Sequence, residues 1–463
     1  MTNPLARAAD TPLAAQLAQF AQALRYEDLP PGVVDRAKLL ILDALGCALG
    51  AVGCEPVNIV ARAMAGGTSA VVATVIGGAR KAPLEEAVLI NGTLTRYLDY
   101  LDVYWREDVS HPGENIPLAL ACVESVGGNG RSLIESVVVG HEVQIRLCNA
   151  FSFQARGFHN ASSGGFVAPL VIGKAWRLPA TTLAHALALH GARHLTLFAL
   201  AKGQLSMAKA MGYPLSAMEA LLAVRLADNG LTGPLEAMEW LFGRLPGSAA
   251  VPVSDLDLDP NRFRLDEVSL KSYPVQFEIQ AAVECAVALH GRVGNVIAQV
   301  SEIVIKVNAV TRERTADPEK FAPGNRETAD HSLPCCVAFA LADGGVTPSQ
   351  FDAQRWLDMD IRALIAKTRV EHDAELEAEF PGGRPASVQL RLCDGRELDA
   401  KTGVPRGDAK RPMSRAEVEA KFISLAQTVL GDASAQRVIA LVNGIDTADT
   451  LDALMDAISY RRG

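Results

Sequence analysis

A short polar stretch, residues 96–115 with the sequence RYLDYLDVYWREDVSHPGEN, interrupts a chain that is otherwise rich in apolar residues. It contains Asp99 and Asp102, and His111 is followed directly by Pro-Gly. A carboxylate pair and a histidine in a low-dielectric pocket are able to transfer protons. The same residues also fit an ordinary polar helix face, on which Asp102 and Arg106 form an ion pair worth about 0.3–0.5 kcal/mol. On composition alone the ordinary interpretation comes first.

Three other segments carry groups that could act on an anion. His159 in RGFHNASSGG precedes small residues, which leave backbone N–H groups open to an anion at a helix start. Lys202 and Lys209 are seven apart and so fall on similar helical faces, and Lys271 lies at the end of a short predicted strand. Each residue also has an ordinary structural explanation. His159 fits a buried histidine, Lys209 a lysine whose stem covers apolar surface, and Lys271 an exposed lysine. Two lysines that enter one cleft from different domains would instead fit a di- or tricarboxylate.

Helices must position most of these residues. Apolar residues at helical spacing fill nearly all of residues 12–243, and strand-like alternation is nearly absent there. The predicted helices include 82–104, 115–126, 131–150, 180–200, 203–228 and 232–243. A helix over 82–104 places Thr95, Asp99, Asp102 and Arg106 on one face.

The pattern changes after a Pro/Asp/Ser-rich connector at residues 244–262. QVSEIVIKVNAV alternates with period two, and PASVQLRLCDGRELDA predicts a hairpin around Cys393-Asp394-Gly395. Helices are expected at about 276–290, 326–343 and 351–365, and again from 414 to 460 after a second connector. We therefore predict a mostly α fold: a helical domain from residues 1–265 and 409–463, made discontinuous by a smaller α+β lid domain at residues 266–408. A pocket is expected between the two domains.

The overall composition of the chain limits the kinds of partner that we expect it to bind. The chain has 463 residues, 49% of them hydrophobic and 21% charged, with a mean hydropathy of +0.15. No apolar run reaches the roughly 20 residues that a bilayer requires, and the first residues lack a signal-peptide pattern, so we expect a cytoplasmic protein without a membrane partner. The eight cysteines show no zinc spacing. A net charge of −9 without a basic tract argues against nucleic acid and favours a small molecule.

The run NGTLTRYLDYLDVYWREDVSHPGEN resembles the signature of the MmgE/PrpD family, which includes 2-methylcitrate dehydratase, cis-aconitate decarboxylase and iminodisuccinate epimerase. Similar segments occur in the family's order over most of the chain. They are DALGCALG near the start, GFH at 157–159, SMAKAMG at 206–212, LKSYPVQFEIQAA at 270–282 and ADHSLPCCVAFALADG at 329–344. The ordered set is more specific than any one segment.

The resemblance implies a large helical domain with an inserted α+β lid, a homodimer, and no metal or organic cofactor. By position, Asp99 and His111 match the acidic and histidine positions of the family's active site. His159 matches the histidine after Gly-Phe, Lys209 the lysine of the SM-x-K segment, and Lys271 the lysine of the lid's K-x-x-P element. The resemblance therefore implies that the first three are catalytic and that the two lysines bind substrate.

The chain also departs from the family pattern. Many members carry a DFDDT or DYNDT-like run, in which Leu101 and Val103 replace a polar residue and a threonine here. A tyrosine of some members falls near Cys335. Asp102 is grouped with the substrate-binding residues as a support of the site. A more apolar wall points to a substrate other than the usual one, although RYLDY and HPGEN look closer to the methylcitrate dehydratase branch.

The expected chemistry is proton abstraction alpha to a carboxylate of a small di- or tricarboxylate, with dehydration of the 2-methylcitrate type as the first prediction. His111 or Asp99 removes the proton, and the other group or His159 protonates the leaving hydroxyl. Decarboxylation and epimerisation need the same groups and remain alternatives, the epimerase less so because its DFDD run is absent. A non-catalytic homodimer that binds a carboxylate or a protein is the alternative from another class.

Overall fold

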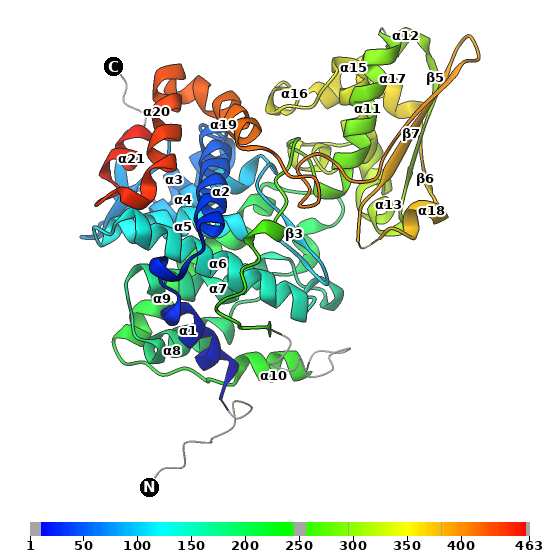
Figure 1. The fold of residues 1–463 in the computed structure, drawn as a ribbon. Helices are drawn as coiled ribbons and strands as arrows, with labels where there is room; N and C mark the ends of the chain where they lie inside the picture. The colour runs from blue at the N-terminus through cyan, green and yellow to red at the C-terminus, as the bar shows by residue number, and fades with distance from the viewer. Residues whose placement is uncertain (1–10, 245–255, 295, 381, 460–463) are drawn as a thin grey trace.

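The chain folds around two main hydrophobic cores, which Figure 1 shows as a large helical part and a smaller part with a sheet. The structure, a computed structural model, describes residues 11–244, 256–294, 296–380 and 382–459. The first core runs from Leu13 to Leu270 and resumes from Val418 to Ile458, whereas the second uses Val275 to Leu392. The predicted mostly helical character is confirmed. The boundaries at 265 and 408 and the lid role stay predictions.

The first core consists of helices that are apolar on several sides, as expected for helices buried among others. The helices of the N-terminal segment are α1 (Leu13–Ala23), α2 (Pro31–Gly50), α3 (Glu55–Ala63), α4 (Leu84–Tyr97), α5 (Asn115–Ser125), α6 (Gly130–Ala150), α7 (Ala161–Ala175), α8 (Ala180–Gly191), α9 (Gly212–Asp228) and α10 (Ala237–Arg244). Helix α2 begins at a Pro-Pro pair, which suits a first turn because its N–H groups need no partner there. Two short hairpins join the helices: β1 (Val72–Thr74) pairs with β2 (Lys81–Pro83), and β3 (Tyr104–Trp105) with β4 (Val109–Ser110).

The C-terminal helices α19 (Arg415–Leu430), α20 (Asp432–Asn443) and α21 (Asp452–Ala457) return to this first core. Figure 1 shows α19, coloured orange, beside the blue α2, with α20 and α21 following it in red. A capping box of Ser414 and Glu417 begins α19. The contact with α2 is close, since a Cβ atom at Gly46 would lie 3.2 Å from the Phe422 ring. The end of the chain thus completes a core that the beginning of the chain starts.

The second core lies under a four-stranded sheet with the order β6-β5-β7-β8. Its strands are β5 (Val300–Val307), β6 (Thr368–His372), β7 (Ala386–Leu392) and β8 (Glu397–Thr402). Strand β5 pairs in parallel with β6 and antiparallel with β7, so that Ile305 lies between Val370 and Val388. The predicted strands and the hairpin at 393–395 are confirmed. Helices α11 (Gln280–Val293), α15 (Leu333–Asp343) and α17 (Met359–Ala366) contribute the rest of this core.

The predicted helix over 82–104 is wrong at its C-terminal end. Helix α4 stops at Tyr97, and Asp99 has a left-handed backbone with φ of 50°. The apolar residues that follow at helical spacing belong instead to a loop that is buried on several sides. The expected shared face is therefore absent, and so is the Asp102–Arg106 pair: Arg106 lies 4.0 Å from Glu267 instead.

Three other predicted helices are shorter or broken. The run 203–228 begins its α-helix only at Gly212, because Pro214 has no N–H and is tolerated only in a first turn. Lys202 and Lys209 therefore share no helix face. Likewise α8 ends at Gly191, nine residues before the predicted end. The run 326–343 divides into α14 (Arg326–Ala329) and α15 around residues 330–332.

The sequence also predicts a connector at 244–262 and no segment that crosses a membrane. Most of the predicted connector at 244–262 lies outside the described residues. Among the described residues no single helix is long and apolar enough to cross a membrane. Helices α2 and α3 pass that test of length and composition only as a pair, with a bend of 83° between them.

Candidate active site

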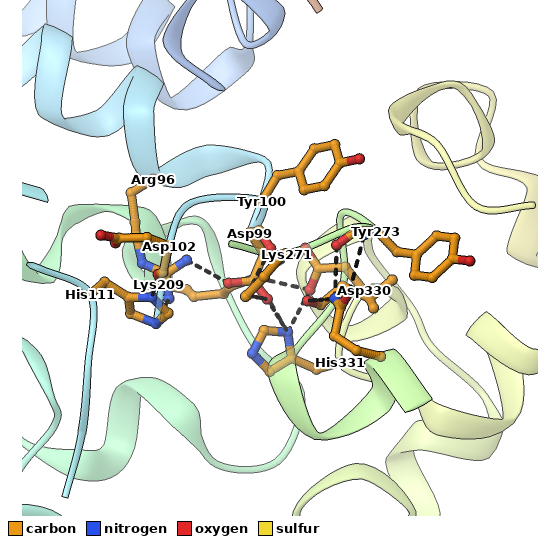
Figure 2. A network of polar contacts seen from close by, with 12 residues as sticks. Arg96, Asp99, Tyr100, Asp102, His111, Lys209, Lys271, Tyr273, Asp330 and His331 are labelled. Atoms are coloured by element: carbon orange, nitrogen blue, oxygen red, sulfur yellow. Dashed lines mark hydrogen bonds and ion pairs between the residues drawn. The ribbon is translucent and has the colours of Figure 1, made fainter. Parts of the chain in front are cut away.

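A cavity lies where the two cores meet, and residues of both parts form its wall. Its polar and charged lining includes Arg96, Asp99, His111, His159, Lys209, Lys271, Gln276 and His331. Val103, Trp105, Val109 and Phe277 form a separate small apolar cluster on the same wall. All predicted site residues except Asp102 therefore line one cavity, although they come from distant segments of the chain. Figure 2 shows the network that joins most of them.

The turn after α4 brings a guanidinium against two carboxylates. Arg96 lies in the last turn of α4. Its Nη1 lies 2.5 Å from Asp99 Oδ1, and its Nε lies 3.0 Å from Glu114 Oε1. The left-handed residue at 99 reverses the chain, so that the carboxylate faces back toward the helix end. Burial raises the pKa of Glu114 to about 7, although Arg96 opposes this shift. Arg96 thus holds one side of the cavity in place.

Lys271 approaches the same aspartate from the other side. Its Nζ lies 3.1 Å from Asp99 Oδ2 and donates to the Asp99 carbonyl oxygen at 2.8 Å. The predicted short strand before Lys271 is a single antiparallel bridge between Ser269 and Val103. Burial lowers the pKa of Lys271 to about 8, with Asp99 opposing the shift. Burial also disfavours the charged form of Asp99, but the cations of Lys271 and Lys209 outweigh it and hold the pKa of that carboxyl well below its usual range.

Lys209 makes a second buried pair, with Asp330. Its Nζ lies 2.8 and 2.9 Å from the two carboxylate oxygens of Asp330 and 3.3 Å from His331 Nδ1. Lys209 comes from the short 3-10 helix Met207–Met211, whereas Asp330 and His331 occupy the break between α14 and α15. Figure 2 shows this pair next to the Asp99–Lys271 pair. Asp99, Lys209 and Lys271 therefore line the cavity, and Asp330 is buried behind Lys209.

The loop after β4 fixes His111. Its Nδ1 lies 2.5 Å from the Asp102 carbonyl oxygen, and its Nε2 lies 3.1 Å from Arg96. Because a carbonyl oxygen only accepts, Nδ1 carries the proton, and the Nε2 lone pair accepts from the guanidinium. Burial and Arg96 hold the pKa of His111 well below its usual range, so the imidazole is neutral.

Asp102 supports this arrangement from outside the cavity. Its carboxylate accepts from the backbone N–H of Gly113 at 2.9 and 3.0 Å and lies 3.3 Å from His141. A Cβ atom at Gly113 would lie 2.8 Å from an Asp102 oxygen, which explains the glycine. Asp102 is not among the described residues that line the cavity, and its contacts agree with the supporting role expected for it. Its grouping with the substrate-binding residues stays a prediction.

His159 lines the cavity ahead of α7. Its Nδ1 accepts from the backbone N–H of Ala161 at 3.3 Å, so the proton of the neutral ring is on Nε2. Burial lowers the pKa of His159 to about 3. The ring therefore offers a hydrogen-bond donor rather than a base. The expected exposed helix start is partly occupied by the histidine itself.

A buried pair behind the cavity fastens its backbone. Lys421 of α19 donates to the carbonyl oxygens of Tyr100 at 2.8 Å and Lys271 at 3.1 Å. The same ammonium lies 2.7 Å from Asp43 of α2. Burial raises the pKa of Asp43, and Lys421 opposes that shift. Helix α19 thus connects the two backbone segments that carry Asp99 and Lys271.

Asp99, Asp330 and His331 also place three potential metal-ligand atoms within 4.8 Å of one another. Carboxylate and imidazole groups suit several metals. Here, however, the ammonium groups of Lys209 and Lys271 already lie within hydrogen-bond distance of both carboxylates. The donor set is therefore matched by protein cations.

Sequence reasoning missed Arg96, Asp330 and His331 as site residues. Asp330 and His331 precede Ser332 and Pro334, a combination that predicts a helix start and hence an exposed turn before it. The sequence contains this signal, but the residues on both sides of it keep a helical spacing, which predicts one uninterrupted helix over 326–343. Among the positions that depart from the family, Val103 lines the cavity, whereas Leu101 and Cys335 are buried in the two cores.

The fold and the site identify the class of protein. Residues 15–248 match the MmgE/PrpD N-terminal domain, and residues 273–447 match the MmgE/PrpD C-terminal domain. The chain therefore belongs to the MmgE/PrpD family.

Relatives of known name are similar over most of their length. The chain is 24% identical to cis-aconitate decarboxylase of Mus musculus over 458 residues, 94% of this chain and 91% of the relative. It is 25% identical to 2-methylcitrate dehydratase of Cupriavidus necator over 410 residues, 81% of each chain. It is 24% identical to the mitochondrial 2-methylcitrate dehydratase of Yarrowia lipolytica over 408 residues, 82% of this chain and 77% of that one.

Proposed function

We propose that the protein is a lyase of the MmgE/PrpD family that acts on a small di- or tricarboxylate by removing a proton alpha to a carboxylate. The first candidate reaction is dehydration of the 2-methylcitrate type. The observation that carries the proposal is the convergence of two lysines, an arginine and three histidines on one cavity between the cores. The names of the relatives agree with this chemistry.

The two lysines supply the carboxylate sites in this proposal. An ammonium group has three N–H donors. Lys209 uses two of them on Asp330, and Lys271 uses one on the Asp99 carbonyl oxygen while its charge lies 3.1 Å from Asp99 Oδ2, so each keeps a donor for a substrate oxygen. Fixed charges in a buried site stabilise the negative charge that develops as the alpha proton leaves, without reorganising water. Binding and activation therefore come from the same two groups.

Hydrogen bonding divides the predicted catalytic residues into different roles. His159 presents an N–H and suits the leaving hydroxyl, toward which it donates. Asp99 is ionised and faces three cations, which makes it a poor proton acceptor. His111 offers its lone pair only if Arg96 moves away, so we assign it to holding Arg96 and the substrate in place. Each effective proton transfer contributes about 10²–10⁴-fold to the rate.

Decarboxylation of a cis-aconitate-like acid is the second candidate. The alignment with the mouse cis-aconitate decarboxylase spans 94% of this chain, more than the alignment with either dehydratase described above. Loss of CO₂ needs the same carboxylate sites, and an electron-accepting neighbour in the substrate replaces the β-hydroxyl. Val103 makes the wall less polar, which suits a substrate with fewer hydroxyl groups.

One experiment separates these reactions. The purified protein is incubated with 2-methylcitrate, citrate and cis-aconitate while short-wavelength absorbance, released CO₂ and thermal stability are measured. A new C=C bond without CO₂ supports dehydration, and stoichiometric CO₂ supports decarboxylation. Deuterium uptake from D₂O without net product indicates epimerisation. Stabilisation by an acid without any conversion would contradict the lyase and favour a carboxylate-binding protein.

The proposal includes three expectations about the working protein. We propose that it acts without an organic cofactor or a resident metal, as a homodimer, and in the cytoplasm. Support comes from the family membership and from the pairing of the site carboxylates with lysines. Light scattering of the purified protein tests the dimer, and activity after dialysis against a chelator tests the metal.

A further inference from the structure

The break between α14 and α15 carries an Asp-His pair, in which His331 lines the cavity and Asp330 is buried beside it. His331 Nδ1 lies 2.6 Å from Asp330 Oδ1, and both residues precede Ser332, whose side chain caps α15 by accepting from the Cys335 N–H. Pro334 occupies the first turn of α15 and could not continue a helix from α14 without loss of a hydrogen bond. The turn is therefore a consequence of the local sequence, and it directs the imidazole toward the substrate space.

The hydrogen bonds of this pair determine which ring nitrogen is protonated. Asp330 holds a charge because both of its oxygens lie against the Lys209 ammonium. A carboxylate accepts hydrogen bonds and donates none, so the His331 nitrogen that lies 2.6 Å away must carry the proton. The contact of 3.3 Å between Lys209 and the same nitrogen is then a secondary approach of two donors. The lone pair of the neutral ring is left on Nε2.

The three cavity histidines differ in whether the lone pair of the ring already accepts a hydrogen bond. The Nε2 lone pair of His111 accepts from Arg96, and the Nδ1 lone pair of His159 accepts from a backbone N–H. Among the polar contacts of the described residues, none engages His331 Nε2. His331 is also only partly buried, whereas His111 and His159 are buried. A lone pair that is free and reachable is the first requirement for a general base.

The charges around His331 keep it ready to accept a proton. Lys209, Asp330 and Asp99 are the charged groups that face it. Burial and Lys209 lower the pKa of His331, while the two carboxylates raise it and so moderate the shift. The ring is neutral near pH 7, and the imidazolium formed on proton uptake gains a carboxylate partner at 2.6 Å. A carboxylate that orients a histidine and stabilises its protonated form is a recurring arrangement in proton-transfer sites.

We propose that His331, oriented by Asp330, is the general base that removes the alpha proton. The inference rests on the proposed function and identifies a residue that the sequence patterns did not single out. In a dehydration, the C–H bond breaks toward His331 Nε2, and its electron pair forms the C=C bond. The C–O bond breaks with its electrons on oxygen, and the imidazolium returns the proton to that oxygen. Water leaves, and His331 is again neutral.

Chemical labelling of the wild-type protein tests the free lone pair without any substrate. Diethylpyrocarbonate reacts with an unprotonated imidazole nitrogen that it can reach, and peptide mapping locates the adduct. We expect His331 to be labelled at pH 7 while His111 and His159 remain unlabelled. The exposed His372 of β6 serves as the internal positive control. A protein labelled at His372 and unlabelled at His331 overturns the proposal.

Kinetics of variants test the catalytic role. His331→Gln should lower kcat by about 10²–10⁴-fold with KM changed by less than threefold, because the lysines that bind the substrate remain. His372→Gln is the matched control and should retain wild-type kcat. In His331→Ala, added imidazole should restore part of the rate. A kcat of His331→Gln within threefold of wild type, or a loss in His331→Ala that imidazole does not restore, overturns the assignment.

The two proposals fail in different ways. If the wild-type protein converts none of the acids tested, the proposed lyase function is wrong, and the labelling pattern still decides whether His331 has the reactive nitrogen. If the wild type is active and His331→Gln is equally active, the function stands and the base must be another group.

Discussion

Lys271 is buried so completely that its side chain loses its charge only slightly above physiological pH. Burial lowers its pKa to about 8, against an ordinary value near 10.4. Above pH 8 the ammonium loses its proton, and with it one of the two carboxylate sites proposed above. We expect KM to rise about tenfold per pH unit above pH 8, while kcat changes less. Initial rates at several substrate concentrations between pH 6.5 and 9.5 provide the measurement.

Lys271→Arg is the control for this pH limit, since a guanidinium remains protonated throughout the range. The variant should bind less well overall because the planar fork does not reproduce an ammonium. Its KM should nevertheless be independent of pH above 8. The same rise in KM in this variant would show that Lys271 does not set the limit.

Gly113 tests how closely His111 must be placed. A methyl group at this position would lie 2.8 Å from an Asp102 oxygen, and the Asp102 carbonyl holds the His111 ring. Gly113→Ala should lower the free energy of unfolding by about 1–3 kcal/mol. Displacement of the ring by about 1 Å should also lower kcat by about 10²-fold. Urea unfolding and steady-state kinetics measure the two effects.

The matched control is Gly32→Ala in the first turn of α2, where a Cβ atom meets nothing within 4 Å. Its unfolding free energy should stay within about 0.5 kcal/mol of wild type. A normal kcat in Gly113→Ala would mean that the loop after β4 tolerates displacement, and that His111 has no positioning role.

At the scale of elements, the Lys421–Asp43 pair joins α19 to α2 and to both segments that carry the site. Lys421→Met should lower the free energy of unfolding by about 3–5 kcal/mol, because it leaves a buried carboxylate without its partner. The double variant Asp43→Asn/Lys421→Met should be more stable than the single variant, since no buried charge is left unpaired. Thermal and urea unfolding of both variants check this order.

The exposed pair between Arg415 and Asp35, 3.6 Å apart, connects the same two helices and serves as the comparison. Arg415→Met should cost at most about 1 kcal/mol. Equal losses for Lys421→Met and Arg415→Met would contradict the fastening role assigned to the buried pair.

Sequence patterns predicted helices better than they predicted where helices end. The apolar spacing through α2 and α6 and the alternation of β5 each reflect contacts made within one element. The end of α4 at Tyr97 has another cause: Asp99 adopts a left-handed backbone that is held by Arg96 and by Lys271. Lys271 is 172 residues away in the chain, so no local pattern could report that constraint.

At the scale of the whole molecule, buried neutral histidines make the protein sensitive to acid. His190 and His194 stack with ring centroids 4.9 Å apart, and burial lowers their pKa values to about 3 and about 4. In the unfolded chain both have pKa values near 6.5. Between these values the unfolded state binds more protons, so the free energy of unfolding falls as the pH falls below about 6.5. At pH 5 the loss should be about 2 kcal/mol per histidine.

Urea unfolding at pH 7, 6 and 5 measures this loss directly. His194→Gln removes one of these titrations and should reduce the slope of unfolding free energy against pH by about one proton. A wild-type protein equally stable at pH 7 and pH 5 would show that these histidines gain protons without unfolding.

The candidate site was predictable in part at this scale. The five predicted residues that line the cavity were identified from residue type and from the family's order of motifs, and they converge in space. His331 was not identified, because its significance depends on Lys209, 122 residues earlier, and on a lone pair that only the hydrogen-bond network reveals. The position of Asp102 behind the cavity wall could not be predicted for the related reason that a helical pattern cannot show which way a loop turns.

The ammonium of Lys421 also sets an order of events for a newly made protein. It holds the backbone at Tyr100 and at Lys271, yet it belongs to a helix and is itself synthesised 150 residues after Lys271. The segments that carry Asp99 and Lys271 are complete long before that residue exists. A nascent chain stalled before α19 should therefore be compact in part but inactive, and a peptide spanning α19 to α21, supplied separately, should restore its activity.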